Sequence, residues 1–147
     1  MAAAGSVIRT RRHSSDGTEY IFDWTADASG DVAEGGTTGK GVFTAHGFLH
    51  SMIFEPGSGA SDLYDLTLLD DGAGASAAID VLRGQGLNQK SAANNTYDTK
   101  YRSNFLNVDG NYLWFDNQKL VLTIANGGNL GSGRIRIKFS RTITDEV

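Results

Sequence analysis

The sequence contains no cysteine, which excludes disulfides, thiolate metal sites and a cysteine nucleophile and leaves the redox compartment open. No apolar run approaches the roughly 18 residues that a membrane-spanning helix needs, so we expect no transmembrane segment. The chain begins with small residues followed by arginines, whereas a secretory signal peptide carries its charges before an apolar run. We therefore expect a soluble protein that is not secreted by that route.

Basic residues are also scarce. Thirteen lysines and arginines are outnumbered by 17 acidic residues, which gives a net charge of −4 and an isoelectric point near 5.2. Nucleic-acid binding in general needs a basic surface, and adsorption to anionic membranes needs clustered positive charge. The composition therefore argues against nucleic acid and against membranes as partners.

Proline occurs once, whereas glycine occurs 19 times and is spread between short apolar runs. This distribution is typical of strands joined by tight turns rather than of a flexible linker. A chain of 147 residues suits one domain. Folding at this size should bury roughly 68–70% of the unfolded surface, which is enough for a hydrophobic core without stabilising disulfides or metal ions.

The longest stretch without a polar run is Gly41–Glu55, GVFTAHGFLHSMIFE, and it predicts the central strand. Both of its alternating faces are largely apolar, so we expect it to be covered on both sides. Its extended length would be roughly 50 Å, which is long for one strand. We therefore predict a bend near Gly47, which would let the strand serve two packed sheets in succession.

Alternating apolar residues predict further strands, among them Tyr20–Thr25, Leu63–Asp70, Lys119–Ala125 and Gly133–Ser140. Asp116–Asn117 is expected to be a turn before the third of these. The side chains expected on the aromatic face of the first strand and the inner face of the last are Tyr20, Phe22, Trp24, Ile135, Ile137 and Phe139.

These elements predict an all-β fold with at most one short helix, at Ala73–Leu82, where alanines favour helix. An antiparallel β-sandwich of about eight strands with long loops is the natural architecture, and a small β-barrel is the alternative. We expect an N-terminal arm over residues 1–13, a single β-sandwich domain over residues 14–141 and a C-terminal tail over residues 142–147.

No catalytic constellation emerges from the residues. His46 and His50 have a spacing that suits a metal on a helix, but on a strand they would lie roughly 13 Å apart. The aspartates between residues 62 and 80 lack the calcium-loop pattern and are better explained as turn caps and solvated loop residues. No phosphate-binding glycine motif and no nucleophile elbow occurs. We therefore predict a non-enzymatic protein with no catalytic residue, metal site or cofactor.

Two groups of basic residues are candidate contacts with a partner. The N-terminal group is either a solvated edge or a docking arm for an acidic partner surface. The second group lies on the outward face of the strand Gly133–Ser140, which is expected to be wet and cationic. The candidate contacts are Arg9, Arg11, Arg12, Arg134, Arg136 and Lys138.

Aromatic residues offer a further possibility. Trp24, Trp114 and the tyrosines are candidates for a carbohydrate-binding or protein-binding surface. A place in the core of a β-sandwich is the simpler interpretation of the same residues.

Three segments of the later part of the chain follow one another in a recognisable order. They are YDLTLLDDGAG (Tyr64–Gly74), IDVLRGQGLNQ (Ile79–Gln89) and KLVLTIANGGNLGSGRIRIKF (Lys119–Phe139). The C-terminal hairpin, an apolar strand, an Asn-Gly-Gly loop and a Gly-Arg-Ile-Arg-Ile strand, resembles that of small virion proteins of tailed bacteriophages. The resemblance is strongest to the β-sandwich decoration (cement) proteins of the capsid exterior. It covers roughly residues 64–139 and is one of pattern rather than of a diagnostic motif.

The resemblance implies a structural protein that is made in the host cytoplasm, binds the outer capsid surface and stabilises the head. Its implied partners are the major capsid protein and further copies of itself, as dimers or trimers. The loops Ala28–Lys40 and Arg83–Lys100 could reach neighbouring subunits, and weak contacts repeated over a lattice add by multivalency. A neck, tail or adaptor protein of the same particle and a carbohydrate-binding β-sandwich module are the alternatives.

Overall fold

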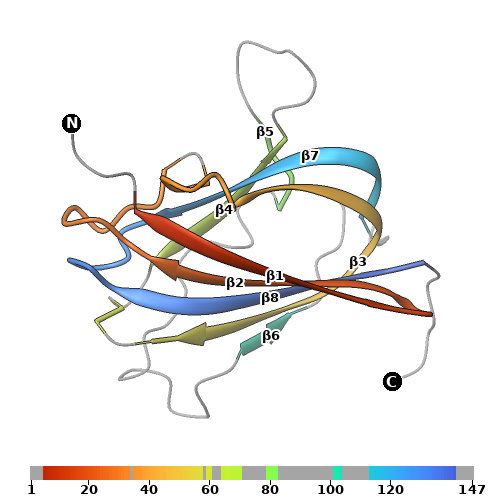
Figure 1. Cartoon of the computed structure of the whole chain (residues 1–147), viewed down its shortest axis with the longest axis horizontal. Coiled ribbons are helices and arrows are strands. Elements are labelled where there is room, and N and C mark those ends of the chain that lie inside the picture. Colours follow the sequence, from red (N-terminus) through yellow and green to blue (C-terminus); the bar gives the residue numbers. More distant parts are fainter. Residues whose placement is uncertain are drawn as a thin grey trace.

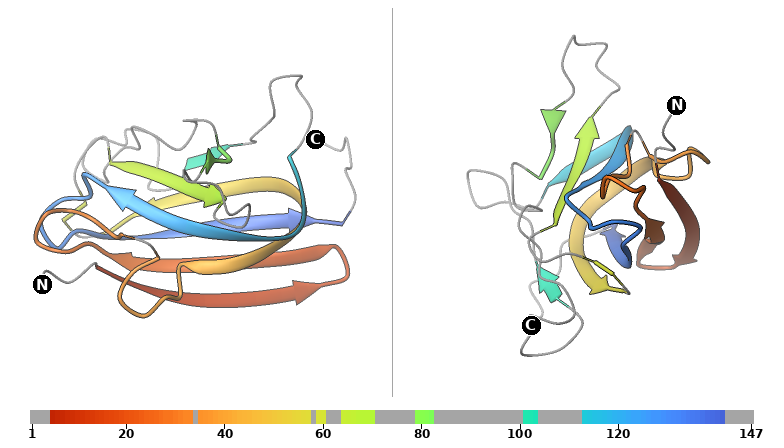
Figure 2. Two further views of the ribbon diagram at one scale, coloured as in Figure 1. Left: turned by 90° about the horizontal axis from the view of Figure 1, so that it is seen from above. Right: turned by 90° about the vertical axis from the view of Figure 1, so that its left-hand side faces the viewer.

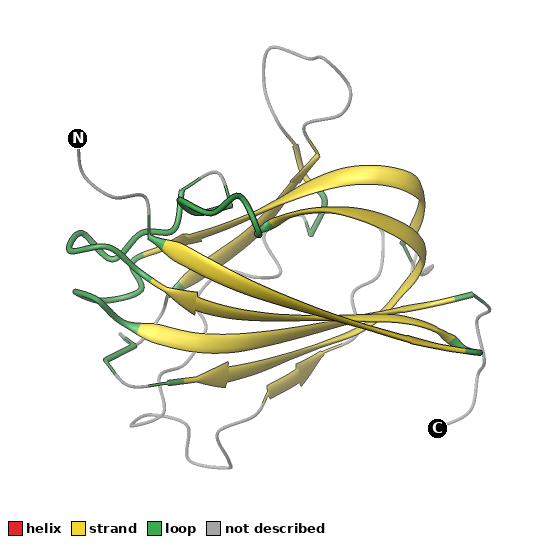
Figure 3. Cartoon of the chain, in the orientation of Figure 1, coloured by secondary structure: helices red, strands yellow, loops and turns green. Residues whose placement is uncertain are grey.

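The computed structural model describes residues 5–33, 35–57, 59–60, 64–70, 79–82, 101–103 and 113–141. In these ranges every regular element is a β-strand and none is a helix (Figure 3). The predicted all-β class is therefore confirmed. The strands are β1 (Ser6–Ser14), β2 (Gly17–Thr25), β3 (Val42–Pro56), β4 (Asp65–Asp70), β5 (Ile79–Asp80), β6 (Tyr101–Ser103), β7 (Trp114–Ala125) and β8 (Ser132–Ser140).

The strands form an antiparallel sheet in the order β1-β2-β8-β3-β7-β4-β5, and β6 pairs with the second half of β3 (Figure 1). The first two strands are a hairpin, and β8 pairs with β2 on one side and with β3 on the other. The last of the described strands therefore occupies an interior position of the sheet, between elements from the first half of the sequence.

The helix predicted over Ala73–Leu82 is wrong for the part of it that the structure describes. Ile79–Asp80 form the short strand β5 beside β4. The Asp80 carboxylate accepts hydrogen bonds from two backbone N–H groups, one on β4 and one in the following turn. These tertiary contacts outweigh the modest helix propensity of the segment. Residues 71–78 and the predicted loop Arg83–Lys100 lie outside the described residues.

The N-terminus also differs from the expected arm over residues 1–13. Ser6–Ser14 form β1, which pairs with β2 along its whole length across the two-residue turn Ser15–Asp16. Only Val7 of this strand is buried, and the other apolar residue, Ile8, is exposed. Its place in the sheet comes from backbone hydrogen bonds. Residues 1–4 and the predicted tail over residues 142–147 lie outside the described residues.

The central strand β3 changes its partner along its length. From Val42 to Phe48 it pairs with β7, and from Phe48 to Pro56 it pairs with β8. Gly47 has a φ of +114°, which a residue with a Cβ rarely adopts, and an added Cβ would lie 2.8 Å from the Ser140 carbonyl oxygen. The bend predicted at Gly47 is confirmed, and Figure 2 shows β3 curving from one part of the sheet to the other.

The expectation that β3 is covered on both faces is wrong for its first half, where Thr44 and His46 are exposed. Before His50, Phe43 and Leu49 are among the buried residues, and beyond it Met52 and Phe54 are. The buried set changes from odd to even numbers at His50, which has no partner in the register with β8. Such a bulge adds one residue and reverses the alternation. Each alternating set therefore contains core residues. The opposite face is partly covered from Phe48 onward, where Ser51 is buried and Phe48 and Ile53 are half-buried.

A second irregularity lies opposite the first half of β3. The turn predicted at Asp116–Asn117 does not form, because β7 continues from Trp114 to Ala125. Instead, these two residues face the single residue His46 of β3. Asn117 has a φ of +53°, a conformation that asparagine tolerates better than most residues. The polar pair is therefore a β-bulge within a strand.

Aromatic contacts join the two parts of the bent sheet. The Phe43 ring of β3 lies 4.9 Å from Tyr20 and 5.0 Å from Phe22 of β2, measured between ring centroids. The Phe115 ring of β7 lies 5.9 Å from Phe139 of β8, and all five side chains are buried. Such pairs add about 0.5–1.5 kcal/mol each beyond the burial of their surface. All six side chains that were expected to lie inside are buried: Tyr20, Phe22, Trp24, Ile135, Ile137 and Phe139.

Replacing Gly47 by alanine should lower the free energy of unfolding by about 3 kcal/mol, because the new Cβ adds contact with the Ser140 carbonyl oxygen to an unfavourable φ. Gly39→Ala is the matched control. Its φ is +70°, but no atom lies within 4 Å of the added Cβ, so it should cost only about 1–2 kcal/mol. Urea unfolding followed by tryptophan fluorescence measures both. Equal losses would contradict a steric role for Gly47.

Tyr64 brings an unusual polar group into the core. Its side chain is fully buried, and its hydroxyl has no hydrogen-bond partner among the described residues. Burial disfavours the phenolate and raises the pKa of Tyr64 above its ordinary value near 10. The hydroxyl of Tyr20, in contrast, donates to the Thr44 carbonyl at 2.9 Å.

Tyr64→Phe should therefore leave the free energy of unfolding at neutral pH unchanged or raise it by up to about 1 kcal/mol, whereas Tyr20→Phe should lower it by about 1 kcal/mol. Above about pH 10 the unfolded chain releases the Tyr64 proton and the folded chain keeps it, so stability falls as the pH rises. The Tyr64→Phe variant should lack this part of the alkaline loss. Urea titrations at pH 7 and between pH 9.5 and 11 give both values, and a large neutral-pH loss in Tyr64→Phe would show that the hydroxyl is bonded.

Candidate partner-binding surface

Strand β1 carries three arginines at one end of the strand order, where it pairs only with β2 among the described strands. The register sets Arg9 beside Phe22 and Arg11 beside Tyr20. Both of these neighbours point into the core, so Arg9 and Arg11 belong to the inner face of β1 and Arg12 to the outer face. A cluster that is contiguous in the sequence is thus divided between two faces.

The inner face of β1 lines a pocket of about 400 Å³, which we call the arginine pocket. It lies between β1, β2 and the first residues of β3. Two of its lining residues are joined by the hydrogen bond from the Tyr20 hydroxyl to the Thr44 carbonyl. The lining residues are Arg9, Arg11, Tyr20, Val42, Phe43 and Thr44.

Arg9 is held in place by the backbone of the segment that leads into β3. Its Nη1 donates to the carbonyl of Val42 at 2.5 Å and to that of Lys40 at 3.3 Å. Both bonds use one nitrogen, so the Nη2 and Nε side of the guanidinium keeps donors for a ligand. Arg11 is exposed, and no acidic side chain of the described residues forms an ion pair with Arg9 or Arg11. The arginine pocket therefore presents two positive charges.

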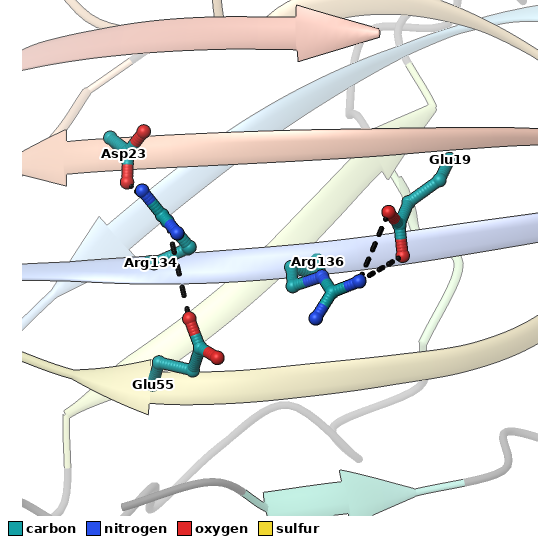
Figure 4. Close-up of polar contacts among 5 residues, drawn as sticks. All are labelled: Glu19, Asp23, Glu55, Arg134 and Arg136. Carbon is teal, nitrogen blue, oxygen red and sulfur yellow. Dashed lines mark hydrogen bonds and ion pairs between the residues drawn. The ribbon is translucent and has the colours of Figure 1, made fainter. Parts of the chain in front are cut away.

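The basic residues of β8 lie in a different setting. They alternate with buried residues as predicted. Figure 4 shows Arg134 between two carboxylates, with Nε 2.7 Å from Asp23 and 4.0 Å from Glu55. In the same figure, Nη2 of Arg136 contacts both carboxylate oxygens of Glu19, at 3.0 and 3.2 Å. Acids from β2 and β3 thus flank the arginines of β8.

These acids change the electrostatic character of the face. The hydrogen bond with Asp23, together with the negative charge of that carboxylate, raises the pKa of the Arg134 guanidinium. Lys138 lies beside Glu19 in the register of β2 and β8. Three acids of neighbouring strands therefore lie among the three bases of β8 and form ion pairs with Arg134 and Arg136. The face that was expected to be cationic is a surface of mixed charge.

The two tryptophans differ in their exposure to solvent. Trp24 is only 1% exposed and belongs to the core, whereas Trp114 is 48% exposed. The Trp114 ring lies 4.6 Å from Phe48 and 5.4 Å from His46 between centroids. His46 in turn has its Nδ1 3.6 Å from Asp116. Of the two tryptophans, Trp114 alone is accessible to a ligand.

The histidines of β3 occupy the two irregular positions of that strand. His50 contacts the Ser51 hydroxyl through Nδ1 at 3.1 Å. Among the described residues, no group of three or more histidines, aspartates and glutamates is arranged to hold a metal ion. The described part of the chain also contains no helix with the length and apolarity to cross a membrane.

The sequence interpretation missed Tyr20 as a lining residue and missed the acidic partners of β8. Glu19 and Asp23 alternate with the aromatic residues of their strand, which is a signal for an outward acidic face. The signal names no partner, because only the pairing of β2 with β8 brings these acids to arginines. Tyr20 was correctly placed inside, but its role depends on the approach of β3.

Comparison with known proteins found no matching family model, no matching curated protein and no matching solved structure.

The ion pairs of β8 predict measurable but small couplings. A double-mutant cycle with Glu19→Gln and Arg136→Gln should give about 1 kcal/mol, because both groups are mostly buried and two contacts form. The cycle with Asp23→Asn and Arg134→Gln should give about 0.5 kcal/mol or less, because solvent screens that more exposed pair. Urea unfolding at low and high salt measures both cycles. A larger coupling for the exposed pair would contradict the order.

Proposed function

We propose that this protein is a non-enzymatic structural component of a tailed-bacteriophage particle, which binds the major capsid protein on the outside of the head and stabilises the head. The resemblance of residues 64–139 to decoration proteins supports this proposal. A neck, tail or adaptor role in the same particle would use the same kind of docking surface and is the alternative.

The observation that carries the proposal is the contrast between the arginines of β1 and those of β8. The chain has a net charge of −4, and the arginines of β8 are matched by acids. Arg9 and Arg11 form no ion pair with the described acids and lie in an edge strand. A local positive strip on an acidic protein steers it toward an acidic surface of a partner and fixes the register of docking.

We further propose that the bent sheet is a β-sandwich of about eight strands. One layer would contain β1, β2, β8 and the second half of β3, and the other the first half of β3 with β7 and β4. The change of partner within β3, from β7 to β8, supports this division into two layers. A closed barrel would pair its end strands, and no pairing between β1 and β5 occurs among the described residues. In a sandwich the edge of β1 remains available to a partner.

Docking need not be strong at a single site. Contacts of modest affinity that repeat over a capsid lattice add by multivalency, especially when the protein forms dimers or trimers. Ile8, which is 66% exposed on the outer face of β1 with Arg12, would add apolar contact on that side of the strand. A docking strip of this kind combines charge for orientation with some burial for stability.

The test uses purified heads that are built from the cognate major capsid protein and lack this chain. The wild-type protein should sediment with them, and the variant Arg11→Glu should show at least about tenfold lower occupancy. The matched control, Lys138→Glu, makes the same change of charge on β8 and should keep most of the occupancy because it leaves β1 intact. Raising the salt concentration should weaken wild-type binding.

Three outcomes decide the question. Loss in the β1 variant alone supports the proposal. Loss in the β8 control alone would move docking to the outer face of β8. Absence of wild-type binding to heads, together with retention on immobilised saccharides, would reject the capsid role and favour a carbohydrate-binding module.

A further inference from the structure

The free edge of β1 is partly used by the chain itself. The Thr37 N–H donates to the Gly5 carbonyl, and the Thr38 hydroxyl donates to the Val7 carbonyl at 2.9 Å. Residues of odd number in this segment therefore direct their backbone carbonyls away from β2. Beyond Val7, no backbone group of the described residues bonds to this edge of β1. With respect to the described part of the chain, the carbonyl and N–H groups of Arg9 and Arg11 are thus available to an added strand.

The same two residues supply the charge of the arginine pocket. In an extended strand, residues two apart share a face and lie roughly 7 Å apart. Arg9 is oriented by the carbonyls of Lys40 and Val42 and keeps its Nη2 and Nε donors. Arg11 is exposed beside it. The pocket therefore offers two guanidinium groups at the repeat distance of alternate residues in a β-strand.

We propose that the arginine pocket binds two carboxylates of an extended acidic segment, which adds to the free edge of β1. This inference rests on the proposed function and names its partner more closely: a segment of the docking partner with acidic residues at alternate positions. Backbone hydrogen bonds to the edge supply affinity, and the two guanidinium–carboxylate pairs select the acidic side chains.

The spacing favours a peptide over a free oxyanion. A single phosphate or carboxylate would bind one guanidinium well, because the planar guanidinium donates two parallel hydrogen bonds to one anion. Two guanidiniums on one strand face match two carboxylates held by one extended backbone. The fixed position of Arg9 also lowers the entropy that binding must remove.

The experiment measures fluorescence anisotropy of labelled peptides with the full chain at low salt. The peptide Thr-Val-Glu-Thr-Glu-Val-Thr should bind at least about tenfold more tightly than its isomer Thr-Val-Glu-Glu-Thr-Val-Thr, because only the first places both carboxylates on one face. The peptide with glutamine in place of glutamate should not bind at the same concentration. Equal binding of the two isomers would overturn the proposed register.

Variants of the chain locate the site. Arg11→Gln should weaken the alternating peptide about tenfold, and Arg9→Lys should weaken it as well because lysine keeps the charge but lacks the fork. Arg12→Gln is the matched control on the opposite face and should change affinity by less than about twofold. Arg11 is exposed, so its replacement should leave the fold intact, which the urea midpoint checks. An unchanged affinity in Arg11→Gln would refute the pocket.

Inorganic phosphate is the competing probe. If phosphate alone binds more tightly than the alternating peptide, with the same dependence on Arg11, the pocket is a site for a free oxyanion and the peptide assignment is wrong. The head-binding assay separates this inference from the proposed function. Head binding that depends on β1 without peptide binding would reject only the inference. Peptide binding without head binding would reject only the capsid role.

Discussion

The close approach of Gly47 to the Ser140 carbonyl is the constraint on which the rest of the structure depends. Only a residue without a Cβ fits there at a φ of +114°. The resulting bend lets β3 leave β7 and continue along β8. It also brings the Phe43 ring against Tyr20 and Phe22, so the aromatic core closes because the strand turns at that glycine.

The bend also creates the candidate binding surface. The first residues of β3 lie beside β1 and β2 only because the strand turns back over them. There they accept hydrogen bonds from Arg9 and Tyr20 through the carbonyls of Val42 and Thr44. The side chains that fix the pocket are thus held by backbone groups of an edge that β7 does not use. A surface that is supported in this way is preordered for a ligand.

The pairing of the strands decides which arginines form ion pairs with acidic residues. The arginines of β1 and β8 look alike in the sequence, and both groups were candidate partner contacts. In the sheet, Arg134 and Arg136 meet Asp23 and Glu19, whereas no described acid forms an ion pair with Arg9. Such pairs contribute at most about 1 kcal/mol each to stability, but they neutralise positive charge on a surface. The distribution of free charge therefore follows from which strands are neighbours.

The sequence by itself determined the all-β class, the inner face of β8 and the bend in β3, because alternation and glycine act through local geometry. Predictions from the sequence were wrong where the local geometry is irregular. The extra residue His50 reversed the alternation of β3, and Asp116–Asn117 formed a bulge instead of a turn. Likewise, the predicted helix is replaced at Ile79–Asp80 by a short strand that pairs with β4. Only the tertiary structure decided which arginines keep their charge available, because ion pairs and pockets form between residues far apart in the chain.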